Sequence, residues 1–291
     1  MGRTGYHARL MEALLTIRDL KIAVESTNSE WHEAISNVSL RVDRGESVGL
    51  VGESGCGKSL TVLSILGLLP SPSVRQLAGS LYFDGESIDY NNSSAFQKLR
   101  GKLIGYIPQD PMSALNPVFT IGNQLTEAVQ LHHDLSYRAA WEHSAELLTQ
   151  VGISPASSRM KAYPHQLSGG QRQRVLIAMA LAGDPELVIA DEPTTALDVT
   201  VQAQVLQLLA NLRDSRGMAL LMVTHDLAVV SEVCDRVVIL YAGQCAESGP
   251  ARSVLNTPHH PYTRALLQSM PGNQHSDQKR LRTILGQVPA L

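Results

Sequence analysis

Three glycines, a lysine and a serine are gathered in one short segment of this 291-residue chain, Gly52–Ser59. The segment follows the apolar run Ser47–Val51 and fits the pattern G-x-x-x-x-G-K-[ST], in which a glycine-rich loop opens a helix. Glycine lets the backbone approach a ligand closely, and the amides at a helix start create a positive potential that suits phosphate. The pattern therefore predicts a phosphate-binding loop, followed by a helix in the apolar stretch Leu60–Leu69.

The residues of this loop suit the phosphates of ATP and a magnesium ion. Lys58 would reach the β- and γ-phosphates, the Ser59 hydroxyl would bind Mg²⁺, and the loop backbone would cradle the phosphates. A flexible surface turn with a stray lysine is the alternative, and the flanking strand and helix patterns argue against it. The predicted nucleotide contacts are Gly52, Glu53, Ser54, Gly55, Cys56, Gly57, Lys58, Ser59 and Leu60.

Two carboxylates follow a second apolar run, Leu187–Ala190. Asp191 would lie at the carboxyl end of a buried strand, the edge at which open α/β sheets bind ligands, and there it could hold Mg²⁺. Glu192 would point in another direction, so it could orient and deprotonate the water that attacks the γ-phosphate. A solvated acidic turn before Pro193 is the alternative for this pair taken alone.

A second candidate anion site lies in the segment Leu167–Gln171. Ser168 is a good N-cap, and Gly169 and Gly170 expose backbone amides at the start of a helix predicted over Arg172–Leu181. A simple capped helix start is the alternative. Because one nucleotide hardly needs two such sites from one chain, two copies arranged head to tail would use both, each closing its Ser168–Gln171 cap on the other's ATP.

Composition limits the classes of protein that the chain can form. Its hydrophobic content of 44% and charged content of 18% are ordinary for a globular protein with a real core. A net charge of −3 and an aromatic content of 4% disfavour nucleic acid as a partner. No apolar run reaches the length of a membrane span, and the three cysteines form neither a metal spacing nor a disulfide framework.

The hydrophobic pattern predicts strands that alternate with helices, which implies a parallel sheet with connecting helices. From Tyr106 to about Ala162 the pattern is helical, a further helix runs over about Val199–Arg213, and the tail from Thr257 onward is less periodic. Strands are predicted over Leu15–Ile22, Ala34–Val42, Gly79–Asp84, Leu187–Ala190 and Leu220–Val223.

Six segments, taken in chain order, resemble the motifs of the ATP-binding cassette (ABC) superfamily. Besides the phosphate-binding loop and the Asp191–Glu192 pair, Leu167–Gln171 looks like its signature motif. Gln109, within Ile107–Pro111, resembles the Q-loop glutamine. Asp198 ends the segment Thr195–Asp198, which resembles the D-loop. His225, within Val223–Asp226, resembles the switch histidine.

The resemblance implies the roles of these residues. Gln109 would touch Mg²⁺ and the attacking water and sense a transmembrane partner, His225 would contact the γ-phosphate, and Asp198 would lie where the D-loop crosses a dimer interface. The implied catalytic residues are Glu192, His225, Gln109 and Lys58. The implied metal ligands are Ser59, Gln109 and Asp191, and the implied nucleotide contacts add Gln109, Asp191, Ser168, Gly169, Gly170, Gln171 and Asp198.

The implied fold is a RecA-like α/β P-loop NTPase core with an antiparallel β subdomain and an inserted α-helical subdomain. The resemblance covers roughly Leu15–Pro250. We expect an N-terminal extension over 1–11, an ABC ATPase domain over 12–250 with its helical subdomain at about 111–183, and a C-terminal extension over 251–291.

A narrower resemblance points to the ATPase subunits of bacterial dipeptide, oligopeptide and nickel importers. It is carried by Asp110–Pro117, Tyr163–Leu167 and Ala190–Thr200, and by the tail segment His259–Leu267. It implies an ATP-hydrolysing subunit peripheral to the cytoplasmic face of the inner membrane that powers import of di- or oligopeptides. A nickel importer and a soluble, non-transport ABC ATPase are the alternatives.

The implied partners are a second ATPase subunit, identical or not, two integral membrane permease subunits and an extracytoplasmic substrate-binding protein, with no nucleic acid. Two positions depart from the family pattern. The aromatic residue that usually stacks on adenine aligns with Val24, and the nearest aromatic is Trp31. Some relatives continue beyond the segment Gly286–Pro289 into a cysteine-rich stretch that can hold an iron–sulfur cluster, so this chain either ends naturally at Leu291 or is a truncation.

Overall fold

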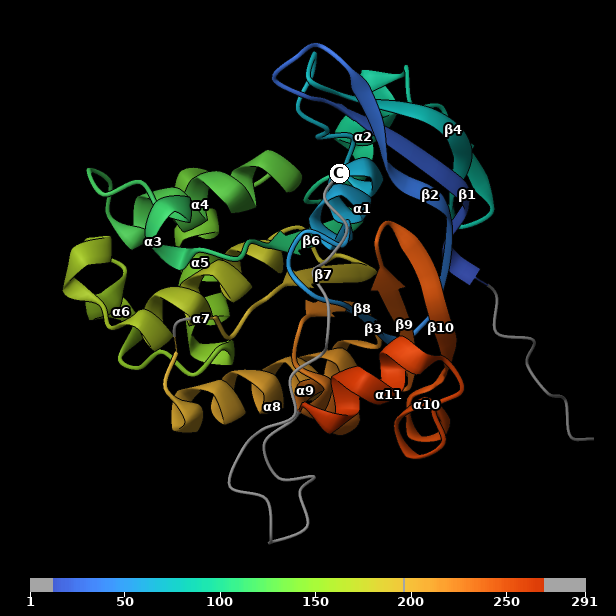
Figure 1. Ribbon diagram of the computed structural model, residues 1–291. Coiled ribbons are helices and arrows are strands. Elements are labelled where there is room, and N and C mark those ends of the chain that lie inside the picture. Colours follow the sequence, from blue (N-terminus) through green and yellow to red (C-terminus); the bar gives the residue numbers. More distant parts are fainter. Residues whose placement is uncertain (1–12, 196, 270–291) are drawn as a thin grey trace, which may run out of the picture.

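The computed structural model of the chain describes residues 13–195 and 197–269. In it two β-sheets lie one above the other, with helices beneath and to one side of the larger sheet (Figure 1). The expected N-terminal extension over 1–11, Ala196 of the D-loop segment, and the expected C-terminal extension from residue 270 onward, which includes Gly286–Pro289, lie outside the described residues.

The smaller sheet is antiparallel, with the strand order β2-β1-β4-β5. The first two strands form a long hairpin whose turn passes through Ser29 at φ +62°. The strands predicted over Leu15–Ile22, Ala34–Val42 and Gly79–Asp84 are confirmed within this sheet, although the third begins earlier than expected, at Val74. The strands are β1 (Ala13–Glu25), β2 (Trp31–Asp43), β4 (Val74–Phe83) and β5 (Glu86–Ile88).

The larger sheet has the strand order β10-β9-β3-β8-β7-β6. Five of these strands run parallel, and β10 is antiparallel to β9 at one edge. The central strands are apolar almost throughout because helices or the other sheet cover both faces. The strands are β3 (Ser47–Val51), β6 (Ile104–Ile107), β7 (Leu187–Asp191), β8 (Ala219–Thr224), β9 (Arg236–Tyr241) and β10 (Gln244–Pro250).

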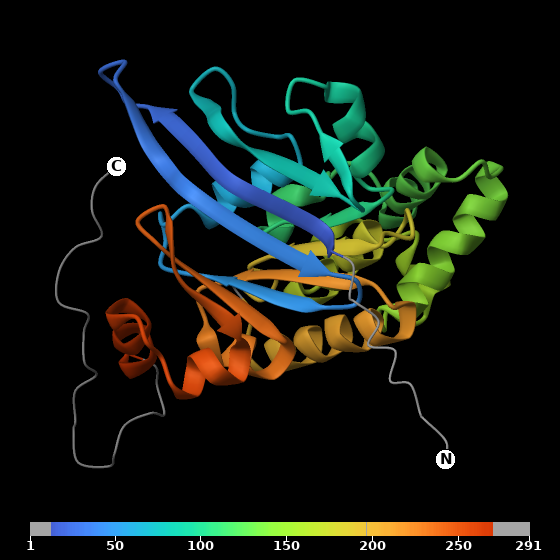
Figure 2. The same ribbon diagram turned by 90° about the vertical axis from the view of Figure 1, so that its right-hand side faces the viewer.

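The helices fall into groups that cover different parts of the two sheets. Figure 2, seen from the side, shows the antiparallel sheet above the larger sheet and α8 to α11 below it. The helices are α1 (Lys58–Ile65), α2 (Ser93–Leu99), α3 (Pro111–Ala114), α4 (Ile121–His132), α5 (Tyr137–Gln150), α6 (Ala156–Arg159), α7 (Gly169–Ala180), α8 (Val199–Arg216), α9 (Leu227–Val233), α10 (Ala251–Asn256) and α11 (Pro261–Gln268), with a 3₁₀ turn, η1, at Pro164–Gln166.

Three hydrophobic clusters hold these layers together. The first joins α1 and α2 to the antiparallel sheet and to one face of the larger sheet, so that α1 lies between the two sheets. The second joins α4, α5, α7 and α8 to the opposite face. The third, which we call the C-terminal cluster, joins α9, α10 and α11 to β3 and β9 through Val51, Leu227, Val230, Val237, Ile239, Ala251, Val254, Tyr262 and Leu266.

Several expectations about the elements are wrong in detail. The chain does not become helical at Tyr106, because this residue belongs to β6, a strand too short to show its own periodicity. The helix after the glycine-rich loop ends at Ile65 instead of Leu69. The tail after Thr257 contains a regular helix, α11, and β9 was not among the predicted strands although Val237–Leu240 is a typical buried run.

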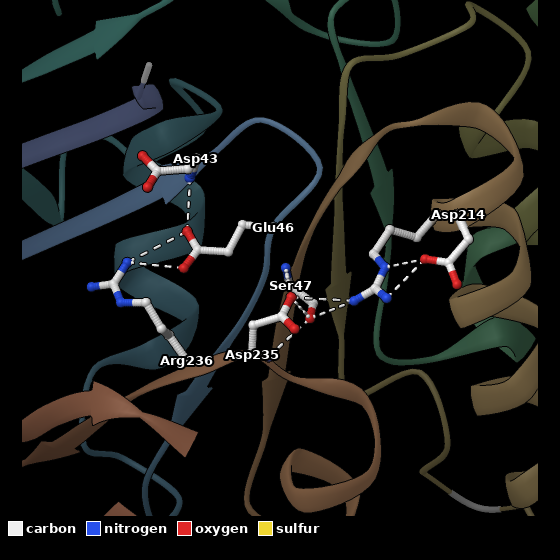
Figure 3. Close-up of polar contacts among 7 residues, drawn as sticks. Asp43, Glu46, Ser47, Asp214, Asp235 and Arg236 are labelled. Atoms are coloured by element: carbon white, nitrogen blue, oxygen red, sulfur yellow. Dashed lines mark hydrogen bonds and ion pairs between the residues drawn. The ribbon is translucent and has the colours of Figure 1, made fainter. Parts of the chain in front are cut away.

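A polar network fixes the amino end of β3 in the larger sheet (Figure 3). Ser47 is fully buried, and its amide and hydroxyl both donate to the Asp235 carboxylate at 2.9 and 2.7 Å. The Arg213 guanidinium on α8 donates to the same serine hydroxyl at 2.7 Å. Beside it, Arg236 is ion-paired with Glu46 at 3.2 Å. The strand that leads into the glycine-rich loop is thereby held at its far end by α8 and by the start of β9.

Candidate nucleotide site

Four of the predicted groups of the nucleotide site lie at the ends of strands of one sheet. The glycine-rich loop follows β3, His225 follows β8, Asp191 ends β7, and Gln109 comes two residues after β6. These four strands are neighbours in the order β3-β8-β7-β6 and run parallel, so their carboxyl ends meet at one edge. That edge is where open α/β sheets bind ligands.

The glycine-rich loop takes a conformation that only glycine tolerates at two of its positions. Gly57 is the N-cap of α1 with φ +104°, and a Cβ there would lie 2.2 Å from Ile35 Cδ1. A Cβ on Gly52 would lie 2.4 Å from the Leu240 carbonyl oxygen and from Cys56 Sγ. The loop is therefore pressed tightly against its surroundings on one side, while Ser54, Gly55 and Ser59 are exposed on the other.

Lys58 curls back over the loop that precedes it. Its side chain is only 6% exposed, and the ammonium donates to the Gly52 carbonyl at 2.7 Å and to the Glu53 carbonyl at 2.9 Å. Two neutral backbone carbonyls thus hold the ammonium within the loop. Because neither carries a negative charge, the positive charge of Lys58 is not neutralised and can still attract an anion. Burial raises the pKa of the Asp191 carboxyl, and the positive charge of Lys58 offsets a small part of that rise.

Asp191 is a buried carboxylate without an ion-pair partner among the described residues. Burial raises its pKa, partly offset by a 3.3 Å hydrogen bond from the Tyr106 hydroxyl. The same burial, with the charge of Asp191, raises the pKa of Tyr106 to about 12, so the phenol remains a donor. A buried carboxylate that lacks a cation suits a metal ion, because isolated buried charge is strongly destabilising.

Glu192 is turned away from Asp191 by an unusual backbone. Its φ of +46° places it in the left-handed region, which costs energy for a residue with a Cβ and is often found where a side chain must be aimed. Three groups hold its carboxylate: Gln109 Nε2 donates to Oε2 at 2.9 Å, Thr195 Oγ1 donates to Oε2 at 3.0 Å, and His225 Nδ1 lies 3.2 Å from Oε1. An ionised carboxylate only accepts, so the Nδ1 atom carries the proton.

The charge state of Glu192 follows from these contacts. Burial, the largest single influence, raises its pKa, but the hydrogen bonds from His225 and Thr195 and the nearby positive charge of Lys58 together lower the pKa below the ordinary value. Glu192 is therefore ionised at neutral pH, as a group that accepts a proton must be.

Gln109 and His225, to which the family resemblance gave roles at the same ATP site, both contact Glu192. Thr195 and Tyr106 complete the cluster, and neither was among the predicted site residues. The Glu192–Thr195 turn, in which the Thr195 amide donates to the Glu192 carbonyl at 3.1 Å, is a local pattern that could have suggested Thr195. Nothing local pointed to Tyr106, which reaches Asp191 only through the alignment of β6 with β7.

The Ser168–Gln171 segment is a complete helix cap. Ser168 Oγ accepts from the Gln171 amide at 3.3 Å, and Gln171 Oε1 accepts from the Ser168 amide at 3.2 Å, which is a capping box. Gly170 lies directly against Val201 of α8, whose own N-cap is Asp198. Within the described ranges these residues share no hydrogen bond with the glycine-rich loop. The chain thus brings the signature segment against the start of α8, which Asp198 caps.

The two candidates for adenine stacking lie on paired strands. Val24 is partly buried against the hydrophobic core. Trp31 begins β2, opposite Glu25, and the Arg75 guanidinium lies 3.8 Å from the centre of its ring. One face of Trp31 is therefore already occupied by a cation–π contact.

Magnesium fits the residues present. No group of three or more His, Cys, Asp or Glu side chains able to hold a metal occurs in the part of the chain that the structure describes. Mg²⁺ needs no such cage, because it keeps several waters and takes one or two carboxylates together with substrate phosphates. Asp191, the exposed Ser59 hydroxyl and the Gln109 side chain have the hard oxygen atoms that this ion prefers.

Comparison with known proteins agrees with this geometry. Residues 35–195 match the family described as ABC transporter, and residues 246–291 match the family described as oligopeptide/dipeptide transporter, C-terminal region. The protein named Probable peptide ABC transporter ATP-binding protein y4tR of Sinorhizobium fredii is 46% identical over 96% of this chain and 83% of its own length. The dipeptide transport ATP-binding protein DppD of Escherichia coli is 44% identical over 95% of this chain and 84% of its own.

Solved structures of ATP-binding cassettes share the fold of this chain. The ATP-binding cassette MJ0796, in a dimeric post-hydrolysis state bound to ADP and Pi, superposes with a TM-score of 0.72 at 28% identity, covering 82% of this chain and 99% of its own. The chain belongs to the ABC transporter family. It is an ATP-binding, ATP-hydrolysing subunit of that family, with the expected P-loop NTPase core, antiparallel β subdomain and helices. None of the helices in the described residues is both long enough and apolar enough to cross a membrane.

Proposed function

We propose that this chain powers the import of di- or oligopeptides from the cytoplasmic face of the inner membrane, using ATP and Mg²⁺. The observation that carries the peptide assignment is the match of residues 246–291 to the C-terminal region of oligopeptide/dipeptide transporters. Relatives that align over nearly the whole chain, such as DppD, are named for dipeptide transport, which supports the same substrate class.

ATP would bind with its phosphates against the amides of Gly52–Leu60 and the Lys58 ammonium. The buried charge of Lys58 and the open face of the loop at Ser54, Gly55 and Ser59 support this placement. Asp191, Ser59 and Gln109 would hold Mg²⁺, which neutralises charge that develops on the transferred phosphate. The adenine ring of ATP would lie outside the glycine-rich loop, near Val24 or Trp31.

Hydrolysis would begin with a water oriented by the Glu192 carboxylate. The water oxygen attacks the γ-phosphorus, its proton passes to Glu192, and the bond to the β-phosphate oxygen breaks. With Nδ1 donating to Glu192, His225 would steady the γ-phosphate through Nε2 as an imidazolium, in which both ring nitrogens donate. The hydrogen bonds from Gln109, Thr195 and His225 keep the carboxylate in one orientation, which supports a role that depends on geometry.

A second ATPase subunit would complete each site. The capping box at Ser168–Gln171 makes no hydrogen bond to the chain's own glycine-rich loop within the described residues, and the adjacent Asp198 opens a helix whose first residue, Val199, is 82% exposed. Two subunits arranged head to tail would then close each signature segment on the other's ATP. ATP stabilises the closed pair and hydrolysis releases it, which is a ligand-driven shift between two states.

The ATPase pair would bind two membrane permease subunits, each beside the Q-loop of one ATPase chain, which is Ile107–Pro111 here. A cavity of about 340 Å³ opens there, with Leu66, Pro108, Ala114 and Leu176 among its lining residues. In the chain segment after Pro108, Met112, Val118 and Phe119 are 65%, 71% and 51% exposed, an unusual set of apolar side chains for a solvated surface. We assign this surface, within Gln109–Phe119, to a helix of the permease. The domain division at 12–250 and 251–291, with a helical subdomain over about 111–183, is part of the same proposal.

The test uses a tagged Glu192→Gln chain expressed in its native cells. The chain is solubilised in mild detergent with ATP and Mg²⁺, and its partners are identified by mass spectrometry, with Lys58→Ala as the matched control that should not trap the closed complex. Two integral membrane proteins in the first sample support the importer. Only soluble proteins or nucleic acid would overturn the transport assignment.

Uptake by cells then separates peptide from nickel. In cells that carry the Lys58→Ala chain in place of the native one, we expect labelled dipeptide uptake to be lost and nickel uptake to be unchanged. Loss of nickel uptake with normal dipeptide uptake would overturn the peptide assignment.

A further inference from the structure

The C-terminal helix α11 reaches the phosphate-binding loop. Its N-terminus is anchored by the Glu247 carboxylate of β10, which accepts from the amides of His259 at 2.9 Å and His260 at 3.1 Å. From there Tyr262 and Leu266 enter the C-terminal cluster beside Val51, the last residue of β3. The helix is thereby joined to the strand that leads directly into the loop.

Tyr262 makes a hydrogen bond to the loop backbone. Its hydroxyl accepts from the Glu53 amide at 3.2 Å, across a sequence separation of 209 residues. The ring is only 7% exposed and packs on Tyr241, with the two ring centres 4.4 Å apart, so the hydroxyl has little freedom to leave this position.

The peptide unit that Tyr262 contacts is also the one that holds Lys58. The Glu53 N–H and the Gly52 carbonyl belong to one planar peptide group, and that carbonyl accepts from the Lys58 ammonium at 2.7 Å. The group is therefore pinned at both ends, by a neutral hydroxyl on one side and by the ammonium on the other. Rotation of this plane would break both hydrogen bonds together.

The other side of the loop has a separate support. The Gly243 amide, in the turn between β9 and β10, donates to the Cys56 carbonyl at 3.2 Å. That contact does not involve α11. The orientation of the Gly52–Glu53 peptide is thus the part of the loop that depends on Tyr262.

The Tyr262 hydroxyl is a neutral acceptor at neutral pH. Burial raises the pKa of Tyr262 to about 12, with a smaller opposing influence from the hydrogen bond of Glu53. A change of charge on Tyr262 therefore plays no part in its contact with the loop.

We infer that Tyr262 is a positioning residue of the nucleotide site: it orients the Gly52–Glu53 peptide and so holds Lys58 in place for phosphate. The inference rests on the proposed phosphate-binding role of Gly52–Ser59. It gives the C-terminal region a direct part in ATP binding, because the region that characterises peptide transporters contributes a group to the loop.

Removing the hydroxyl leaves the Glu53 N–H without its acceptor. In the nucleotide-free protein this peptide can then turn towards water, and ATP binding must restore the original orientation. We expect Tyr262→Phe to weaken ATP binding about tenfold, the effect of one hydrogen bond lost in a nearly buried position. Because Glu192, Gln109 and His225 are untouched, kcat should change by less than about twofold while KM for ATP rises in step with Kd.

The experiment measures ATP binding to the full-length chain by calorimetry, together with kcat and KM for hydrolysis. Tyr241→Phe is the matched control, since it removes a hydroxyl from the neighbouring ring in the same cluster, and it should leave Kd within about twofold of wild type. If Tyr262 had only a structural role, Tyr262→Phe and Tyr241→Phe would lower the thermal stability to a similar extent. Tyr262→Phe would then not raise KM for ATP while leaving kcat unchanged. Equal Kd values for wild type and Tyr262→Phe would overturn the inference.

A second measurement does not depend on a variant. Amide hydrogen exchange in the nucleotide-free wild-type protein should show the Glu53 N–H strongly protected compared with the exposed Ser54 amide next to it. Exchange of Glu53 as fast as that of Ser54 would also overturn the inference. Failure of the wild-type chain to bind ATP at all would instead contradict the nucleotide site itself, so the two failures are distinguishable.

Discussion

Replacing Glu192 by glutamine changes the charge of the side chain but hardly its shape. The new amide oxygen can accept from Gln109 and Thr195 in place of Oε2, where the native distances are 2.9 and 3.0 Å. The new amide nitrogen can donate to His225 Nδ1, 3.2 Å away in the native chain, once the imidazole takes its other tautomer. All three hydrogen bonds can therefore persist without the carboxylate.

The expected effect is a loss of turnover with little change in binding. A general base contributes about 10²- to 10⁴-fold to a rate, so kcat should fall about 10³-fold, or ~4 kcal/mol of transition-state stabilisation. The phosphate-binding loop and Lys58 are unchanged, so the Kd for ATP should stay within about threefold. The variant should accumulate in the ATP-bound, closed form.

Steady-state phosphate release and calorimetry give these two numbers. Thr195→Val is the matched control: it removes one of the three hydrogen bonds to Glu192 and leaves the carboxylate charge, so kcat should fall by only about tenfold. A kcat for Glu192→Gln within tenfold of wild type would refute Glu192 as the base, whatever its affinity for ATP.

Three further outcomes are expected. Lys58→Ala should abolish measurable ATP binding by calorimetry, because the loop then lacks its charge; binding of wild-type strength would contradict that role. Ser47→Ala removes the hydroxyl that joins Asp235 and Arg213, so denaturant unfolding should show a loss of about 1–3 kcal/mol with ATP affinity unchanged; an unaltered free energy of unfolding would speak against the network. The pKa of Glu192 is lowered from its ordinary value of 4.5, so its ionised form contributes stability that is present above that value and is lost as pH falls through the folded-state pKa. The stability advantage of wild type over Glu192→Gln should therefore shrink as pH falls below 4.5, and an advantage that grows there would contradict the direction of the shift.

The residues that gather at the proposed site were largely predictable because most of them lie in short contiguous motifs. A glycine-rich loop before a helix, two carboxylates at a strand end and a serine N-cap each act through local backbone geometry, which neighbouring residues determine. The alternation of strands and helices followed from periodicity for the same reason. Two of the errors fall on short or featureless elements, since β6 has four residues and α11 lies in a tail with no visible period. A third, β9, is a typical buried run that the prediction passed over.

The sequence by itself therefore determined the glycine-rich loop Gly52–Ser59, which we propose binds phosphate, and the Asp191–Glu192 carboxylate pair, which we propose serves hydrolysis. Only the tertiary structure decided which side chains support these groups. Tyr106 reaches Asp191 across 85 residues, His225 reaches Glu192 across 33, and Tyr262 reaches Glu53 across 209. Contacts of this kind depend on strand order and on the packing of α11 against β3 and β9, and no local pattern specifies them, because they exist only once distant segments share a core.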